Sequence, residues 1–289
     1  MPPRYRDILI AGCGRIGQRL GLALATTGAR VWGLRRSDAP LPAPIIPVRA
    51  DLTDPETLTA ALDGCRPQAV FYITTPAEYT EAGYRAAFVT GQRNLIEALQ
   101  AHDVHPAWQC FVSSLSVYAQ SDGEWVDESS PTEPANFSGR RLLDGEAITA
   151  GAPWPATVVR FAGIYGGGGG RGRLIRRVRD GSGCVESPPR WTNRIHEDDC
   201  VGFLAHLASL PEPERLYLGV DDEPALQCTV MDWLAERLGC PRPPRVAGET
   251  QPPRGGNRRA RNERLHASGY RPLYPTFREG YAAVLAGSD

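Results

Sequence analysis

Three glycines near the beginning of the chain have the spacing that receives the pyrophosphate of a dinucleotide. Gly12, Gly14 and Gly17 form the pattern G-x-G-x-x-G directly after the apolar run 8–11. In such a turn the first glycine permits a tight bend, the second lets the main chain approach the phosphates, and the third lets the helix pack closely on the strand. The helix N-terminus then offers N–H groups to the anion. We predict a dinucleotide site formed by Gly12, Cys13, Gly14, Arg15, Ile16 and Gly17.

The elements expected around these glycines make the pattern specific. A buried strand over 8–11 precedes it, a helical pattern continues to Thr27, Gly28 ends that helix, and 29–34 has the composition of a second strand. This strand–turn–helix–strand context separates a dinucleotide site from a chance match. The alternative is a glycine-rich turn that binds no ligand.

The end of the second expected strand predicts which nicotinamide cofactor binds. NAD-preferring sites usually place an Asp or Glu there to hold the ribose 2′-hydroxyl. In this chain the place is taken by Arg35, Arg36 and Ser37. A guanidinium group fits a 2′-phosphate through two parallel hydrogen bonds, whereas a carboxylate would repel it. We therefore predict NADP(H) as the cofactor; the alternative is a pair of surface arginines without a ligand.

Further cofactor contacts are expected where the next two strands end. Asp51 and Leu52 follow the third strand, and the Asp51 carboxylate is placed to meet the adenine amino group or to play a structural role. A fourth strand over 69–73 ends in Thr74, Thr75 and Pro76, where the chain passes the cofactor.

Strands and helices alternate along this part of the chain. A long helical pattern over 77–102 follows the fourth strand, and a fifth strand over 108–112 comes next. Such alternation predicts an α/β fold in which helices cover both faces of a parallel sheet. The fold class expected is a Rossmann-type doubly wound parallel sheet with a smaller C-terminal substrate lobe.

Composition excludes several other classes of protein. The 289 residues carry a net charge of −1, which argues against a general nucleic-acid binder. All 32 basic residues other than histidine are arginines, so no mechanism that needs a lysine is available. No apolar run is long enough for a membrane span and no signal peptide is evident, so we expect a cytoplasmic protein. The seven cysteines lack C-x-x-C spacing and are expected to be reduced thiols, without a disulfide framework or metal site.

Four later segments resemble one known family. They are SSLSVYAQ at 113–120, RFAGIYG at 160–166, NRIHEDDCVGFL at 193–204 and YLGVDDEP at 217–224. They are similar to the extended and atypical short-chain dehydrogenases/reductases, the NAD(P)-dependent epimerase/dehydratase-like group. The resemblance implies that 1–165 form the NADP-binding Rossmann domain, that 195–210 return to it, and that 166–289 form most of the substrate lobe. By the same resemblance, a homodimer is an expected assembly.

The chain departs from this family at its catalytic residues. Members normally use a Ser-Tyr-Lys set in which the last two residues are spaced Y-x-x-x-K. Ser114 matches the family's serine, but Phe137 stands where the tyrosine is expected and Arg141 where the lysine is expected. Phe137 has no ionisable group. Arg141 remains protonated, so it is suited to holding ribose or phosphate and not to moving protons.

A different proton donor is then required within hydrogen-bond reach of the substrate. The candidates are Tyr118, Tyr165 and His196, each with a packing role as the alternative. For substrate binding we name Ser114, Tyr165, Arg171 and His196. The run of glycines over 166–170 is either a flexible surface loop or a flap that closes over the substrate.

These features favour an NADP(H)-dependent oxidoreductase that acts on a small polar substrate, including anionic ones, through a non-standard proton donor. Two alternatives stay open. One is a nucleotide-sugar epimerase or dehydratase, weakened by the missing Tyr and Lys. The other is a non-catalytic NADP(H)-binding sensor, favoured by the same loss.

Overall fold

The computed structural model describes residues 3–167, 172–247 and 256–287. The chain divides into two compact units. The first unit comprises Met1–Val117, Glu133–Arg160 and Val201–Tyr217, and the second comprises Tyr118–Thr132, Phe161–Cys200 and Leu218–Asp289. The chain therefore passes between the units several times, and the segments 118–132 and 161–165 belong to the second unit although the sequence placed them in the first.

The first unit is built on a seven-stranded sheet with the order β12-β7-β5-β4-β1-β2-β3. Its strands are β1 (Asp7–Ala11), β2 (Arg30–Arg35), β3 (Ile46–Arg49), β4 (Ala69–Tyr72), β5 (Trp108–Ser114), β7 (Ala156–Phe161) and β12 (Leu216–Gly219). The pairs β1–β2, β2–β3, β1–β4 and β4–β5 are all parallel. The order reverses between β1 and β4, as in a doubly wound Rossmann sheet, so the predicted fold class is confirmed.

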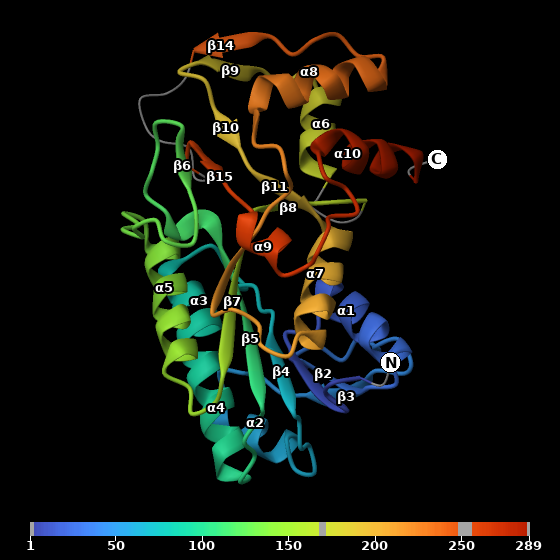
Figure 1. Cartoon of the computed structure of the whole chain (residues 1–289), viewed down its shortest axis with the longest axis vertical. Helices are drawn as coiled ribbons and strands as arrows, with labels where there is room; N and C mark the ends of the chain where they lie inside the picture. Colours follow the sequence, from blue (N-terminus) through green and yellow to red (C-terminus); the bar gives the residue numbers. More distant parts are fainter. Residues whose placement is uncertain (1–2, 168–171, 248–255, 288–289) are drawn as a thin grey trace. The chain divides into compact units, whose positions relative to one another are not determined.

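Helices cover both faces of this sheet. Figure 1 shows α1 on one face and α4 and α5 on the other. The helices of the sheet region are α1 (Arg15–Thr26), α2 (Pro55–Ala61), α3 (Glu81–Arg85), α4 (Gly91–Ala101), α5 (Phe137–Ala150) and α7 (Glu197–Ser209). The short 3₁₀ turn η2 (Leu115–Val117) follows β5. Strands β1, β4, β5 and β7 are almost fully buried, as expected for a parallel sheet covered on both sides, whereas β3 at the sheet edge is mostly exposed.

The helix expected over 77–102 begins at Glu81 and contains a wider turn. Thr80 caps it, because its hydroxyl accepts a hydrogen bond from the Gly83 N–H at 3.0 Å. The segment η1 (Ala86–Thr90) is a π-helix between α3 and α4. Its Ala87 carbonyl accepts a hydrogen bond from the Tyr72 hydroxyl at 2.5 Å, which supplies a side-chain partner at the irregular turn.

The second unit consists of helices and two-stranded sheets. Its sheets pair β11 with β8, β14 with β9, β15 with β6 and β10 with β13. Their bounds are β6 (Glu124–Val126), β8 (Gly163–Tyr165), β9 (Cys184–Ser187), β10 (Trp191–Thr192), β11 (Arg194–His196), β13 (Ala225–Leu226), β14 (Arg245–Ala247) and β15 (Arg258–Ala260). The helices are α6 (Arg173–Arg179), α8 (Gln227–Leu238), α9 (Glu263–Ala267) and α10 (Phe277–Ala286). One apolar core, which includes Val178, Val230, Met231, Leu234 and Phe277, joins α6, α8 and α10.

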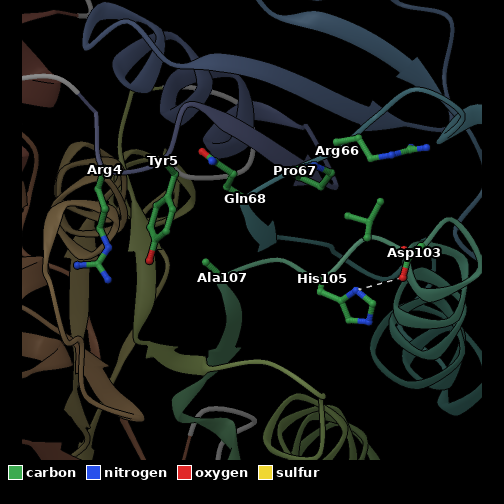
Figure 2. A pocket seen from close by; sticks show the side chains of 9 residues that line it. Arg4, Tyr5, Arg66, Pro67, Gln68, Asp103, His105 and Ala107 are labelled. Atoms are coloured by element: carbon green, nitrogen blue, oxygen red, sulfur yellow. Dashed lines mark ion pairs between the residues drawn. The ribbon is translucent and has the colours of Figure 1, made fainter.

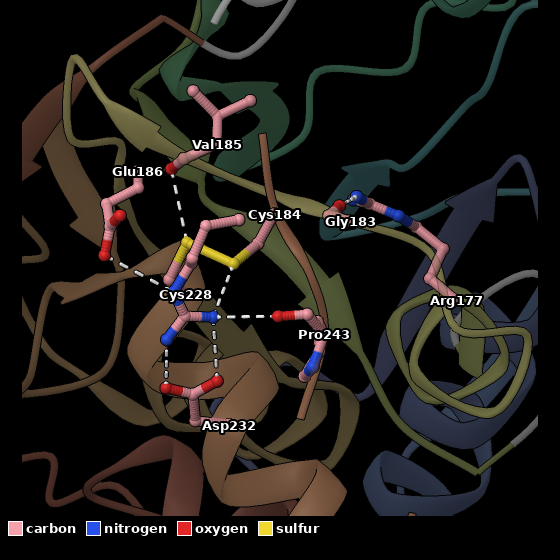
Figure 3. Close-up of a disulfide and its surroundings, with 9 residues drawn as sticks. Arg177, Gly183, Cys184, Val185, Glu186, Cys228, Asp232 and Pro243 are labelled. Atoms are coloured by element: carbon pink, nitrogen blue, oxygen red, sulfur yellow. Dashed lines mark hydrogen bonds and ion pairs between the residues drawn. A yellow bond between two sulfur atoms is a disulfide. The ribbon is translucent and has the colours of Figure 1, made fainter. Parts of the chain in front are cut away.

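A disulfide joins Cys184 of β9 to Cys228 of α8, with Cα atoms 5.4 Å apart (Figure 3). The expectation that all seven cysteines are reduced thiols is therefore wrong for this pair. The two residues lie 44 positions apart and no local spacing marks them, because only the packing of α8 beside β9 brings them together. An Arg245 Nη1 atom donates to the Cys184 sulfur at 3.0 Å and is itself paired with Asp232. The cysteines that remain free are Cys13, Cys65, Cys110, Cys200 and Cys240.

None of the helices in the described part of the chain is long and apolar enough to span a membrane.

Candidate functional site

The glycine turn lies where the sheet order reverses. Gly12 follows β1 with φ at +85°, a conformation that favours glycine. A Cβ atom added to Gly12 would lie 2.4 Å from the carbonyl oxygen of Ile73, which follows β4. The N–H groups of Gly12 and Cys13 donate to the Leu34 carbonyl of β2 at 3.0 and 2.9 Å. The turn is thus held against the ends of the two strands that flank β1, the crevice where doubly wound folds bind dinucleotides.

The second and third glycines show the two roles that the spacing predicts. A Cβ atom on Gly14 would meet nothing closer than the Gly12 oxygen at 4.0 Å, so space is open beside the main chain at the N-terminus of α1. Gly14 is the N-cap of α1 and provides no side chain to the helix end. A Cβ atom on Gly17 would lie 3.0 Å from the Ile10 side chain, so this glycine permits close packing of α1 on β1. The turn therefore fits a pyrophosphate.

The intervening residues of the turn differ in exposure. Cys13 and Ile16 are buried, whereas Arg15 is exposed. Burial raises the pKa of the Cys13 thiol to about 11, and the nearby Arg35 charge offsets only part of that rise. Cys13 is thus a neutral thiol at pH 7 that shapes the turn by packing.

The two arginines after β2 are each held by a neighbouring polar group. Nε and Nη2 of Arg35 donate to the Ser37 hydroxyl at 2.9 and 2.5 Å. Arg36 Nη1 lies 3.6 Å from the Asp51 carboxylate, which follows β3. Arg36 and Ser37 are exposed. Two guanidinium groups, that of the partly buried Arg35 and that of the exposed Arg36, therefore lie with a hydroxyl at the carboxyl end of β2, where a ribose 2′-phosphate is expected.

The Asp51 carboxylate forms hydrogen bonds with Thr53 in addition to its ion pair with Arg36. Its Oδ1 atom accepts hydrogen bonds from the N–H and hydroxyl of Thr53 at 2.9 and 2.7 Å. Burial acts to raise the pKa of Asp51, but the Thr53 hydrogen bonds and the Arg36 charge together lower it. The neighbouring Leu52 carbonyl accepts a hydrogen bond from Asn94 of α4 at 2.9 Å. This geometry supports a structural role for Asp51, the alternative that the sequence left open.

Thr74, Thr75 and Pro76 follow β4 on the same side of the sheet as the glycine turn. Thr75 is exposed, and the Thr74 hydroxyl donates a long hydrogen bond to Ala87 of η1 at 3.4 Å. The segment runs next to the turn, because a Cβ atom added to Gly12 would lie 3.0 Å from Thr74 Cα.

The family's catalytic positions in the first unit are Ser114, Phe137 and Arg141. Ser114 ends β5, and its hydroxyl accepts a hydrogen bond from the Ser116 N–H at 3.2 Å. Phe137 is the first residue of α5. Arg141, one turn later, is paired with Asp144 at 2.7 Å and with Glu81 of α3 at 3.1 Å. The residue in the lysine position is thus neutralised by two carboxylates and ties α5 to α3.

An aromatic cluster that sequence reasoning missed surrounds Phe137. The ring centroids of Tyr79 and Tyr84 lie 5.3 and 5.5 Å from that of Phe137, and 5.4 Å from each other. Tyr79 lies between β4 and α3 and is half exposed. Its place three residues after Pro76 was the sequence signal for a role near the site.

Tyr118, in the second unit, is a packing residue in this structure. It is only 2% exposed, and its hydroxyl donates to the Asp127 carbonyl at 2.7 Å. This placement favours the packing alternative over proton donation.

Tyr165 and His196 are brought together by the pairing of β8 with β11. Their rings lie 5.2 Å apart, and each is no more than 5% exposed. Burial and the nearby Asp221 carboxylate raise the pKa of Tyr165 well above its usual range, which makes it a poor acid. His196 Nδ1 accepts a hydrogen bond from the Asp198 N–H at 3.2 Å. Arg171 lies outside the described residues.

A groove of about 680 Å³ opens at the amino ends of the strands, opposite the glycine turn (Figure 2). It is lined by residues that precede strands: Tyr5 before β1, Gln68 before β4 and Ala107 before β5. Dinucleotides bind at the carboxyl ends of strands in this fold, so this groove is not the cofactor crevice. Among the described residues, no group of three or more His, Cys, Asp or Glu side chains is arranged to hold a metal ion.

The sheet order and the glycine turn together define a doubly wound protein of the dinucleotide-binding class. The family model described as "RmlD substrate binding domain" matches residues 6–179. The chain belongs to this family and, with it, to the epimerase/dehydratase-like atypical branch of the short-chain dehydrogenase/reductase superfamily, as the sequence resemblance predicted.

Solved structures agree with this assignment. A protein from Methylobacillus flagellatus, described as a candidate NAD-dependent epimerase/dehydratase, is 38% identical over 98% of both chains, with a TM-score of 0.79. A conserved protein of unknown function from Silicibacter pomeroyi is 29% identical over 98% of this chain and 99% of its own, also with a TM-score of 0.79. The enzyme WbmG from Bordetella bronchiseptica, solved with NAD and UDP, is 18% identical over 98% of this chain and 94% of its own, with a TM-score of 0.80, and shares the fold. No curated protein sequence matches the chain.

Proposed function

We propose that this protein is an NADP(H)-dependent oxidoreductase of the short-chain dehydrogenase/reductase type that acts on a small polar substrate. The observation that carries the proposal is the pairing of an open glycine turn with two arginines after β2. The turn leaves space beside Gly14 for a pyrophosphate. Arg35 and Arg36 provide cationic donors where a 2′-phosphate would lie. The 38% identical structure described as NAD-dependent supports a nicotinamide dinucleotide in general.

Each residue of the site has a distinct task in this proposal. The turn Gly12–Gly17 and the N-terminus of α1 bind the pyrophosphate, and Arg35, Arg36 and Ser37 bind the 2′-phosphate. NADP(H), when bound, supplies or accepts a hydride. Ser114 hydrogen-bonds the substrate oxygen, in keeping with its place at the end of β5. Arg141 holds α5 in place through its two carboxylate partners and takes no part in proton transfer.

A second candidate function is epimerisation or dehydration of a nucleotide sugar. It is favoured by the family and by neighbours such as MoeE5, which was solved with UDP-glucuronic acid and NAD and is 24% identical. The residues at the start of α5 weigh against it. Phe137 and Arg141 lack the phenol and the lysine amine that start oxidation of the sugar in that chemistry.

Calorimetry with NADP⁺, NADPH and NAD⁺ tests the cofactor. We expect NADP⁺ to bind at least about tenfold more tightly than NAD⁺, since one charge-assisted contact is worth more than 1.4 kcal/mol. Equal or tighter binding of NAD⁺ would contradict the proposal. NADPH oxidation is then followed at 340 nm with a panel of aldehydes, ketones and imines. Epimerisation and dehydration of a nucleotide sugar consume no NADPH overall, so UDP-glucose and UDP-glucuronic acid are incubated separately and their products are identified by chromatography. Conversion of a nucleotide sugar alone would favour the second function, and binding without any turnover would favour a sensor.

A further inference from the structure

The loop between β4 and α3 places a phenol beside the position where the family's tyrosine is missing. The Tyr79 ring packs edge-on against Phe137, with centroids 5.3 Å apart. Phe137 in turn begins α5, the helix that carries the catalytic tyrosine in typical members. Tyr79 is 50% exposed, so protein covers only half of this residue. The phenol that α5 lacks is thus present in the same unit on a different element.

A hydrogen-bond chain orients this phenol. The Ser138 hydroxyl lies 3.5 Å from the Tyr79 oxygen and donates to Asn136 Oδ1 at 2.8 Å. Asn136 Oδ1 also accepts from the Gly139 N–H at 2.7 Å, because Asn136 caps α5. Since the one Ser138 proton is committed to Asn136, Tyr79 is the donor in its contact with Ser138. At 3.5 Å that contact is long and easily exchanged for one with a substrate oxygen.

We propose that Tyr79 is the proton donor that replaces the family's tyrosine. The inference rests on the proposed function. During reduction the substrate carbonyl carbon accepts the hydride from NADPH, the carbonyl π bond breaks, and the oxygen takes the Tyr79 proton to become a hydroxyl. The Tyr79 phenolate then regains a proton from water, which its exposure allows, and Ser138 can turn its hydroxyl toward the phenolate meanwhile.

The neighbouring phenols are less suited to this task. Burial and the adjacent Tyr79 raise the pKa of Tyr84, which disfavours release of its proton. The Tyr118 hydroxyl donates a hydrogen bond to the Asp127 carbonyl. Tyr165 is buried, with a pKa raised further by Asp221.

Tyrosine nitration tests the position of Tyr79 without any substrate. Tetranitromethane modifies accessible phenols, and peptide mass spectrometry reports the extent at each tyrosine. We expect Tyr79 to be nitrated in the free protein and protected by NADP⁺. The matched probe is 2′-phospho-ADP-ribose, which has the same phosphates but no nicotinamide ring and should leave Tyr79 reactive.

The outcomes separate this inference from the proposed function. If calorimetry shows no binding of either probe, both fail. If both bind and neither changes the nitration of Tyr79, or both protect it equally, the phenol is not beside the nicotinamide and only the inference is overturned.

Variants then test proton transfer from Tyr79, with a substrate that the NADPH oxidation assay has identified. Tyr79→Phe should lower kcat by about 100-fold or more, the usual contribution of a general acid, while NADP⁺ affinity is unchanged. Tyr84→Phe removes a phenol from the same cluster and should keep wild-type turnover. Adding Phe137→Tyr to Tyr79→Phe returns a phenol to α5 and should restore part of the lost rate. Undiminished kcat in Tyr79→Phe would overturn the proposal.

Discussion

Arg36 reaches across from the end of β2 to the carboxylate that follows β3, with 3.6 Å between its Nη1 atom and Asp51 Oδ2. Asp51 is thereby turned toward an arginine and toward Thr53. The same contact holds the Arg36 guanidinium at the carboxyl edge of the sheet. Discrimination between NADP and NAD should therefore depend on this pair of strand ends.

Replacing both arginines after β2 should abolish the preference for NADP. In Arg35→Ala/Arg36→Ala we expect NADP⁺ affinity to fall by about 100-fold, since two charge-assisted contacts of about 1.5 kcal/mol are lost, and NAD⁺ affinity to change little. Calorimetry measures both. Arg30→Ala is the matched control, because Arg30 starts the same strand and pairs with Asp7 at 2.6 Å. An unchanged ratio of the two affinities in the double variant would show that the phosphate is not bound here.

Two glycines of the turn should respond differently to the same added methyl group. Gly14→Ala places Cβ in open space, so we expect an unchanged thermal midpoint but greatly weakened NADP⁺ binding. Gly12→Ala combines φ at +85° with a Cβ 2.4 Å from the Ile73 oxygen, so we expect loss of stability itself. Differential scanning fluorimetry with and without NADP⁺ distinguishes the two. Full cofactor binding by Gly14→Ala would mean that the pyrophosphate lies elsewhere.

A buried ion pair should contribute strongly to the stability of the first unit. Arg160 Nη2 of β7 lies 2.6 Å from Glu146 Oε2 of α5, and the Ser113 hydroxyl of β5 also donates to this carboxylate at 2.6 Å. Both charged side chains are at least 89% buried, so Arg160→Met leaves an unpaired carboxylate and should cost about 3 kcal/mol or more.

Urea unfolding measures this loss. The exposed pair of Arg49 with Asp38 provides the control, and Arg49→Ala should cost no more than about 1 kcal/mol. Equal effects of Arg160→Met and Arg49→Ala would contradict the prediction.

The disulfide should stabilise the second unit. It closes a segment of 44 residues between β9 and α8, so Cys228→Ser should lower the free energy of unfolding by about 2–4 kcal/mol under oxidising conditions. Reduction with dithiothreitol should lower the unfolding free energy of the wild type to that of the variant. Cys240→Ser, which removes a free cysteine just after α8, is the control. If the unfolding free energies of wild type and Cys228→Ser still differ under reduction, the loss of stability comes from packing and not from the disulfide.

Asp221 should make stability fall as pH rises from acid toward neutral. The residue is 2% exposed, and burial raises the pKa of its carboxyl well above the usual range, with Arg194 offsetting only part of that rise. The unfolded chain releases this proton near pH 4, before the folded protein does, so wild type loses stability from about pH 4 up to the raised pKa. Asp221→Asn should remove this loss, so its unfolding free energy relative to wild type should rise with pH. Parallel pH profiles of the two proteins would refute this.

Local spacing explains why so much of the fold was predicted from sequence. The glycine turn and the alternation of strands with helices are short-range patterns, and each lies where it was expected. The helix was expected from 77 but begins at Glu81, after the Thr80 cap, and the π-turn at 86–90, whose Ala87 carbonyl accepts a hydrogen bond from Tyr72 of β4, was not predicted. Tyr165 and His196 were singled out by type, but their burial depends on the pairing of β8 with β11.

The sequence by itself determined the class of fold, the dinucleotide turn and the loss of the Tyr-x-x-x-Lys pair, because these are carried by residues close together along the chain. Tertiary structure alone decided three further relationships: Arg36 beside Asp51, Cys184 bonded to Cys228, and Tyr79 packed on Phe137. Each joins two elements whose separation in sequence is large. Their contact depends on how strands and helices pack, and packing has no signature in the spacing of residue types.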